Sequence, residues 1–121
     1  MAGHNDFGSE AEELAADYLA KLGYQILVRN YRYLKAEVDI ICKMDNTVVF
    51  VEVKARSTDL FLEPHEAVSK KKIRLVLSAA DQFMESRVED ARFDIISVLP
   101  DQSGALQISH LTDAFSAIDA Q

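Results

Sequence analysis

Apolar residues recur at helical spacing in two segments of the chain, and short β-rich runs lie between and after them. Residues 9–22 carry an apolar side chain every three or four positions, with acids in the first turn and Gly23 at the end. This pattern predicts a first helix, with Asp6 or Ser9 as its cap. The same periodicity from about Pro64 to Ser86 predicts a second, longer helix, for which Pro64 is a suitable start.

Five runs rich in β-branched and aromatic residues predict strands. They cover residues 24–28, 37–42, 47–53, 93–99 and, as a short edge strand, 106–109. The segment NYRYLKA is predicted to be a connection, MDN a hairpin turn, and the end of the chain a weak helix. The order helix, three strands, helix, strand predicts an α/β fold with an αβββαβ core. In its mixed central sheet, flanked by helices, the last main strand runs parallel to the third.

Length and composition predict the class of protein and its cellular compartment. The 121 residues are 49% hydrophobic and 27% charged, as expected of one ordinary domain covering 1–121, with 1–7 as a flexible terminus. The lone Cys42 cannot form an internal disulfide and is predicted to be a buried apolar filler. The polar N-terminus and the lack of an apolar run of about 18 residues predict a cytoplasmic protein without a membrane segment.

The charge of the chain is unevenly distributed. A formal net charge of −7 argues against a protein that coats nucleic acid through bulk electrostatics. Residues 18–36 and 68–80 nevertheless contain four basic residues each and no acid. The sequence therefore predicts local contacts with phosphate rather than a uniformly basic surface.

Two neighbouring predicted strands carry acids and a lysine where apolar residues would be expected. Strand alternation in VFVEVKAR places Glu52 and Lys54 on one face, about 7 Å apart along the backbone. Asp39 interrupts the apolar run EVDII, and pairing through the MDN turn brings it alongside Glu52. Two adjacent carboxylates favour a cation between them, and oxygen ligands suit Mg²⁺ or Mn²⁺.

This constellation suits phosphodiester hydrolysis. A metal held by Asp39, Glu52 and the Val53 carbonyl can lower the pKa of a bound water and neutralise a phosphate oxygen. Lys54 can orient the attacking water or stabilise the charge that develops, and Arg56 can hold the adjacent phosphate. The alternative is an ordinary cross-strand ion pair on a solvated strand face.

An Asp on one strand followed by Glu-x-Lys on the next resembles the PD-(D/E)XK nuclease superfamily, which has the restriction-endonuclease-like fold. The chain from Gly8 to Phe115 resembles the UPF0102 (YraN-like) family in GYQILVRNYR, AEVDII, VVFVEVKAR and EAVSKKKIR. Its layout is also similar to that of archaeal Holliday-junction resolvases. The resemblance implies an endonuclease that requires Mg²⁺ or Mn²⁺ and cleaves DNA, including branched or structured DNA, and it implies a homodimer.

By position, the resemblance implies that Asp39 and Glu52 are the metal ligands and Lys54 the catalytic lysine. Glu12 matches a glutamate of the first helix that supports the metal, often through water. Its alternative is a structural role in an acidic first turn. The sequence departs from the family pattern at Ala36, where the family usually has Gly.

Basic residues of the second helix, Lys71 and Arg74, fall where the family has bases facing the substrate, although charge runs often form only a solvated helix face. Arg32 lies with another basic residue, Arg29, among tyrosines, as in single-strand binders, but packing of those tyrosines on the first helix is the favoured explanation. The histidines are predicted to be incidental. Two other functions stay open: a catalytically silent nucleic-acid-binding module, and a protein-interaction adaptor in DNA repair or uptake.

Overall fold

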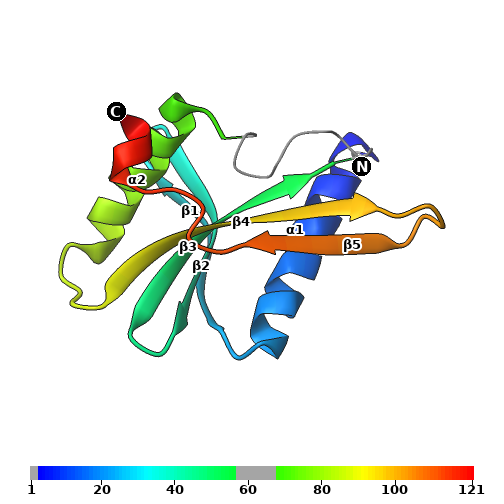
Figure 1. Cartoon of the computed structure of the whole chain (residues 1–121), viewed down its shortest axis with the longest axis horizontal. Coiled ribbons are helices and arrows are strands. Elements are labelled where there is room, and N and C mark those ends of the chain that lie inside the picture. The colour runs from blue at the N-terminus through cyan, green and yellow to red at the C-terminus, as the bar shows by residue number, and fades with distance from the viewer. Residues whose placement is uncertain (1–2, 57–67) are drawn as a thin grey trace.

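A five-stranded mixed sheet with one long helix on each face forms the frame of the protein (Figure 1). The computed structural model describes residues 3–56 and 68–121. The strands lie in the order β1-β2-β3-β4-β5, which is also their order along the chain. This arrangement confirms the predicted α/β class and is consistent with a restriction-endonuclease-like core.

Helix α1 (Gly3–Lys21) covers one face of the sheet. Ala11, Ala15 and Leu19 are fully buried there, as the helical spacing predicts. The helix begins upstream of the expected start, so Asp6 and Ser9 lie inside it and do not cap it. It can extend this far because no proline interrupts the segment that precedes them. The end is as predicted, because Gly23 adopts a φ of +103° that glycine tolerates without strain. Flexibility of residues 1–7 stays a prediction.

Strands β1 (Gln25–Tyr33) and β2 (Ala36–Met44) form a longer hairpin than the sequence predicts. Only Leu34 and Lys35 of the polar segment NYRYLKA form a turn; its tyrosines continue β1, and their rings pack against the core on the α2 side. Tyr31 makes an edge-to-face contact with Phe83 of α2 at a centroid distance of 5.3 Å. The expectation that these tyrosines pack on the first helix is therefore wrong.

Strands β3 (Thr47–Ala55) and β4 (Asp90–Pro100) pair in parallel through nine residue pairs at the centre of the sheet, which confirms the predicted orientation. Strand β5 (Leu106–Leu111) pairs antiparallel with β4 and forms the edge. The inner pair can be parallel because α2 lies between the two strands in the chain and provides the crossover.

Helix α2 (Lys70–Met84) covers the second face. It begins at Lys70, where the Ser69 side chain accepts a hydrogen bond from the Lys72 N–H at 3.1 Å. The expected start at Pro64, like His65, lies outside the described residues. A short 3₁₀ helix, η2 (Ala117–Ala120), packs beside α2 and is the weak terminal helix that the sequence predicts.

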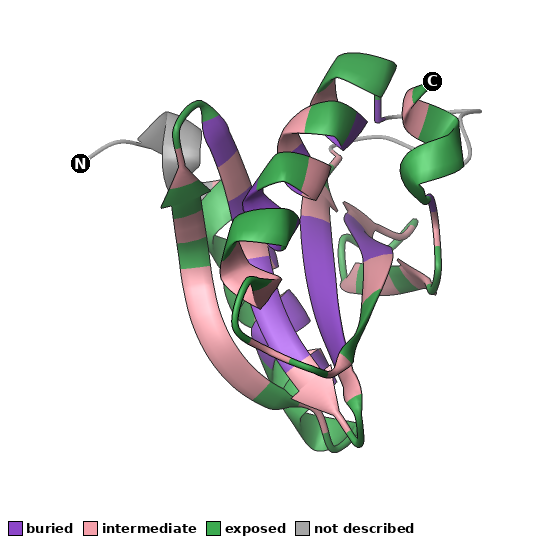
Figure 2. Ribbon diagram, turned by 90° about the vertical axis from the view of Figure 1, so that its left-hand side faces the viewer, coloured by how far each residue is buried: buried purple, intermediate pink, exposed green. Residues whose placement is uncertain are grey.

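Two apolar cores lie on opposite faces of the sheet. Figure 2 shows the buried residues concentrated on the inner strands and on the sheet-facing sides of the helices. The α1-side core includes Val49, Val51 and Leu19, and the α2-side core is built around Phe50. The alternation of β3 therefore places Glu52 and Lys54 on the α2 side. Within the described residues, no helix is long and apolar enough to cross a membrane.

Candidate functional site

Asp39 lies at a kink in β2. The β1–β2 pairing omits Asn30 and Asp39, and Asn30 has a left-handed φ of +56°. Val38 and Ile40 would share a face in a regular strand, yet Val38 packs in the α2-side core and Ile40 in the α1-side core. The kink therefore places Asp39 at the boundary between the two layers of the protein.

The β2–β3 ladder also ends beside Asp39. Its last recorded pair is Ile40 with Val51, and the next pair in the same register is Asp39 with Glu52. There the Asp39 side chain replaces a ladder bond, because its Oδ2 accepts a hydrogen bond from the Val53 N–H at 2.8 Å. The structure thus brings Asp39 and Glu52 together, as the hairpin pairing predicts, at a point where the two strands part.

Two lysine ammonium groups lie close to the Glu52 carboxylate. Its Oε2 lies 3.6 Å from Lys54 Nζ on the same strand face and 3.6 Å from Lys72 Nζ on α2. Lys72 also donates a hydrogen bond to the Glu37 carbonyl at 3.4 Å. The other oxygen, Glu52 Oε1, is buried and has no hydrogen-bond partner among the described residues. Both ammonium groups therefore lie against one oxygen of the carboxylate, and no donor from the described residues reaches the other oxygen.

Both central carboxyls resist ionisation. Burial raises the pKa of Glu52 to about 7, with a further contribution from the negative charge of Asp39, although the two lysines oppose the shift. Burial likewise raises the pKa of Asp39, against the Val53 N–H and the Lys72 charge. Burial is therefore the main reason why the charged forms of both carboxyls are disfavoured.

Glu12 approaches the same site from α1. Burial and the negative charge of Asp39 raise the pKa of Glu12, while the guanidinium of Arg29, 3.7 Å away, lowers it. Glu12 is therefore electrostatically linked to Asp39. Among the residues that the structure describes, however, no three acids, histidines or cysteines come close enough to form a metal-binding group. Direct joint ligation by Glu12, Asp39 and Glu52 is not preformed in this geometry.

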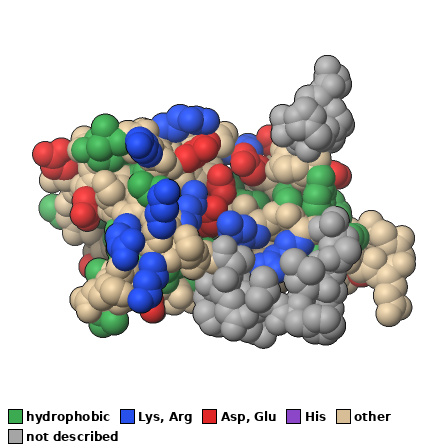
Figure 3. Space-filling model, turned by 90° about the horizontal axis from the view of Figure 1, so that it is seen from above, with side chains coloured by type: hydrophobic (Ala, Val, Ile, Leu, Met, Phe, Trp, Pro, Cys, Tyr) green, Lys and Arg blue, Asp and Glu red, His purple; other side chains and the backbone are tan. Residues whose placement is uncertain are grey.

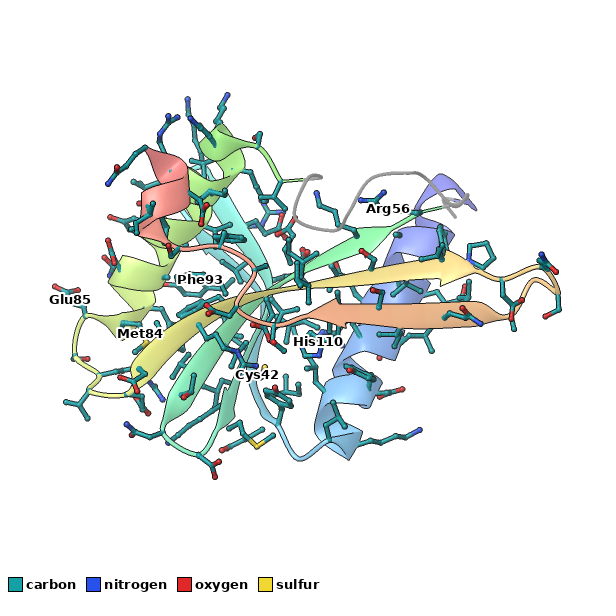
Figure 4. The ribbon with its side chains drawn as sticks, in the orientation of Figure 1. Cys42, Arg56, Met84, Glu85, Phe93 and His110 are labelled. Carbon is teal, nitrogen blue, oxygen red and sulfur yellow. The ribbon has the colours of Figure 1, made fainter. Side chains whose placement is uncertain are left out.

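The predicted phosphate-binding residues have separate surroundings. Arg56 follows β3, where its N–H bonds the Val98 carbonyl, and Figure 4 places it at the far end of that strand. Lys71 is exposed on α2. Arg74 donates a hydrogen bond to the Ala120 carbonyl at 3.1 Å, and the exposed Arg32 lies 3.6 Å from Glu37. Of these bases, none makes a recorded contact with Glu52 or Asp39.

Lys and Arg side chains nevertheless gather on one end of the molecule. Figure 3 looks onto the end where β3 finishes and α2 begins, and it shows basic side chains with acids between them. The chain is negative overall, yet basic side chains gather on this end of the molecule.

Lys72 is the site residue that the sequence analysis missed. The helical spacing contains a signal for it, because Lys72 lies four positions before the buried Val76 and so on the sheet-facing side of α2. The resemblance to the family implied Lys71 instead, which is exposed on α2.

A second polar cluster surrounds Asp94, on the other side of the sheet. Asp94 is fully buried and accepts hydrogen bonds from Arg92, from His110 Nε2 at 2.8 Å and from the Asp113 N–H. His110 Nδ1 in turn lies 3.1 Å from the Tyr18 hydroxyl of α1 (Figure 4). His110 is therefore a structural link between the edge strand and α1, and the expectation that it is incidental is wrong.

Cys42 is a buried filler, as predicted. Its Sγ lies 3.7 Å from the Val49 carbonyl, and burial raises the pKa of the thiol to about 12, so it stays protonated at neutral pH. Ala36 is also buried, at 3% exposure, in the α2-side core. Its methyl group therefore packs inside the protein.

The comparisons with known proteins agree on one family. The model of the family described as "Uncharacterised protein family UPF0102" matches residues 11–98. A UPF0102 protein of Christiangramia forsetii is 45% identical over 117 residues, which cover 95% of this chain and 98% of that protein. A UPF0102 protein of Flavobacterium johnsoniae is 42% identical, with coverages of 95% and 98%. One of Chlorobium phaeobacteroides is 40% identical, with coverages of 91% and 93%.

Proposed function

The chain belongs to the UPF0102 family, and from this premise and the geometry around Asp39 and Glu52 we propose that it is a metal-dependent endonuclease that hydrolyses DNA. The names of the relatives state no reaction, so the support comes from the site. Asp39, Glu52 and Lys54 are the proposed catalytic group, and Mg²⁺ or Mn²⁺ is the proposed cofactor.

One observation carries the proposal: a buried glutamate, Glu52, and a half-buried aspartate, Asp39, lie near two lysines at the point where β2 and β3 part. Buried acids destabilise a fold unless a compensating charge is present. Glu52 Oε1 has no hydrogen-bond partner among the described residues, and both acids have raised pKa values. Groups held in this way are typical of functional sites, where a ligand supplies the missing charge.

The donor atoms fit a hard cation. Asp39, Glu52 and the Val53 carbonyl offer only oxygen, and Mg²⁺ is usually held by one or two carboxylates together with water and phosphate. When bound, the metal would supply positive charge for a phosphate oxygen and a more acidic bound water. The Val53 N–H fixes the orientation of Asp39. Glu12 is proposed to act from behind, through water and through its electrostatic link to Asp39.

The two lysines have different proposed tasks. Lys54 lies on the same face of β3 as Glu52 and close to the end of that strand. From there it can orient a water or contact the phosphate. Lys72 is anchored to the Glu37 carbonyl as well as to Glu52, and this double contact suits a residue that positions Glu52. Arg56, Lys71, Arg74 and Arg32 are proposed to contact neighbouring phosphates of the DNA.

The test compares two lysine variants on labelled duplex, single-stranded and branched DNA with Mg²⁺ or Mn²⁺. Lys54→Ala is expected to abolish cleavage while DNA binding and the thermal transition persist. Lys43→Ala is the matched control, because Lys43 also pairs with a glutamate, Glu89, but near the other end of β2. Absence of metal-dependent cleavage of every substrate, or equal loss in both variants, contradicts the proposal.

A second function is favoured by a specific observation. The two lysines already neutralise one oxygen of Glu52, and the described residues contain no three-acid metal group. Both features suit a nucleic-acid-binding module without turnover. Such a module binds DNA equally well after Asp39→Asn and shows no cleavage in the unaltered protein, whereas the nuclease cleaves and loses that activity on the same substitution.

A further inference from the structure

The turn between β1 and β2 contains a leucine in a strained backbone conformation and exposed to solvent. Leu34 has a left-handed φ of +57° and is 84% exposed. The other described non-glycine residues with positive φ are Asn30, Asp45 and Asp113, whose short polar side chains tolerate that conformation. The leucine side chain cannot hydrogen-bond the backbone to offset the strain of this conformation, and at this position it buries little apolar surface. Strained residues of this kind are concentrated at ligand contacts and other functional sites.

The turn lies close to the site. It ends at Ala36, and the next residue, Glu37, accepts a hydrogen bond from Lys72, which contacts Glu52. Between the turn and α2 is a hollow of about 440 Å³, lined by Tyr33, Leu34, Lys35, Ala36, Leu75 and Ser78. Leu34 therefore stands at the edge of an apolar hollow, a short distance along the chain from Asp39.

Positive charge flanks the leucine. Arg32 and Lys35 are exposed on either side of it, and α2 carries the exposed Lys71 and Arg74 across the hollow. This is the end of the molecule on which Figure 3 shows the basic side chains. An apolar tip between cations matches duplex DNA, whose phosphates attract the cations and whose base steps accept an apolar wedge.

We propose that Leu34 inserts between two base pairs of duplex DNA and unstacks that step, while the basic side chains of Arg32 and Lys35 bind the phosphates on either side. The inference rests on the proposed DNA substrate but not on cleavage. It makes Leu34 a specificity residue, because a step that is already weakened, such as one at a mismatch, costs less to open.

The experiment measures unstacking directly. The full-length protein is titrated in EDTA into duplexes that carry 2-aminopurine, a base that brightens when it unstacks, beside a mismatch or in a perfectly paired sequence. The protein is expected to bind the mismatched duplex more tightly and to raise its fluorescence. Leu34→Gly is expected to lose the fluorescence rise and about tenfold in affinity for the mismatched duplex, as expected for removing a buried leucine side chain.

The stability of Leu34→Gly and two further variants separate a wedge from a structural role. Leu34→Gly relieves the left-handed strain, so its thermal stability should equal or exceed that of the unaltered protein. Leu34→Met keeps a long apolar side chain and is expected to retain unstacking. Val88→Gly is the matched control, because Val88 is 92% exposed on a different turn, and it should leave DNA binding unchanged.

Each contrary result is distinct. DNA binding or cleavage without a Leu34-dependent fluorescence rise overturns the wedge and leaves the nuclease proposal intact. Failure to bind any duplex at low salt overturns the wedge together with the DNA substrate. A dimer that dissociates on Leu34→Gly, with unchanged DNA affinity, identifies a contact between two copies of the chain and also overturns the wedge.

Discussion

Replacement of Glu52 by Gln is expected to stabilise the folded protein at alkaline pH. Glu52 has a pKa of about 7 in the fold and 4.5 as an ordinary glutamate, because burial and Asp39 disfavour its charge. The folded state therefore binds the Glu52 proton more tightly than the unfolded state does. The contribution to stability is largest below pH 4.5, decreases between 4.5 and 7, and is lost above 7. Gln stays neutral throughout, so the variant avoids this loss.

The size of the effect follows from the same two pKa values. One pKa unit corresponds to about 1.4 kcal/mol, so the free energy of unfolding of Glu52→Gln should exceed that of the unaltered protein by on the order of 3 kcal/mol at pH 8.5, relative to their difference at pH 4.5. The attraction of Lys54 and Lys72 is already contained in this value, because both lysines lower the pKa of Glu52. Glutamine has nearly the volume of glutamate, so packing should change little.

Urea unfolding at intervals from pH 4.5 to 8.5, without divalent metal, measures the difference. Glu89→Gln is the control of opposite sign, because hydrogen bonds from Arg87 hold the pKa of Glu89 at about 2 and its charge therefore stabilises the fold above pH 4.5. That variant should be less stable by a constant amount across the range. A Glu52→Gln curve that runs parallel to the unaltered protein, or that falls below it as pH rises, refutes the reasoning.

The remaining predictions concern metal, the buried network and the packing of the helices. Mg²⁺ or Mn²⁺ should raise the melting temperature of the unaltered protein at pH 8 and leave that of Glu52→Gln nearly unchanged, as calorimetry can check. Asp94→Asn should cost about 3–5 kcal/mol in urea unfolding at pH 7, because it leaves Arg92 and His110 without their carboxylate. Burial opposes ionisation of Asp94, but the hydrogen bonds from His110 and Arg92 prevail and lower its pKa, so the stability that they provide should disappear as pH falls through that lowered value. Leu19→Ala should cost about 2–5 kcal/mol by the same method, because it opens a cavity in the α1-side core.

The elements with strong periodicity could be predicted from the sequence. Strand β3 has an apolar run with a clear alternation, so the common face of Glu52 and Lys54 followed directly from strand geometry. The parallel pairing of β3 with β4 followed from the helix between them. The extent of β1 did not follow, because NYRYLKA is locally polar, and the contact of Tyr31 with Phe83, which favours the strand, comes from far along the chain.

The candidate site divides in the same way. The proximity of Asp39 and Glu52 depends on a hairpin with a short turn and could be predicted. The contact of Lys72 with Glu52 depends on the rotation of α2 about its own axis, which is set by the helix start at Ser69 and by the burial of Val76. Successive helix residues are about 100° apart around the axis, so the rotation that buries Val76 brings Lys72 rather than Lys71 toward the sheet.

The kink at Asp39 explains why acids and bases from both layers meet at one place. A regular β2 would direct Asp39 to one face, so that it could be close to α1 or to α2 but not to both. Because the pairing omits Asn30 and Asp39, the carboxyl lies at the boundary of the layers, where Lys72 of α2 lowers its pKa and where its own charge raises the pKa of Glu12 of α1. The left-handed Asn30 is thus a positioning residue for the whole site. A β-branched residue tolerates positive φ poorly. Its introduction at position 30 should therefore displace the Asp39 carboxyl more than any substitution of an exposed residue on α2 does.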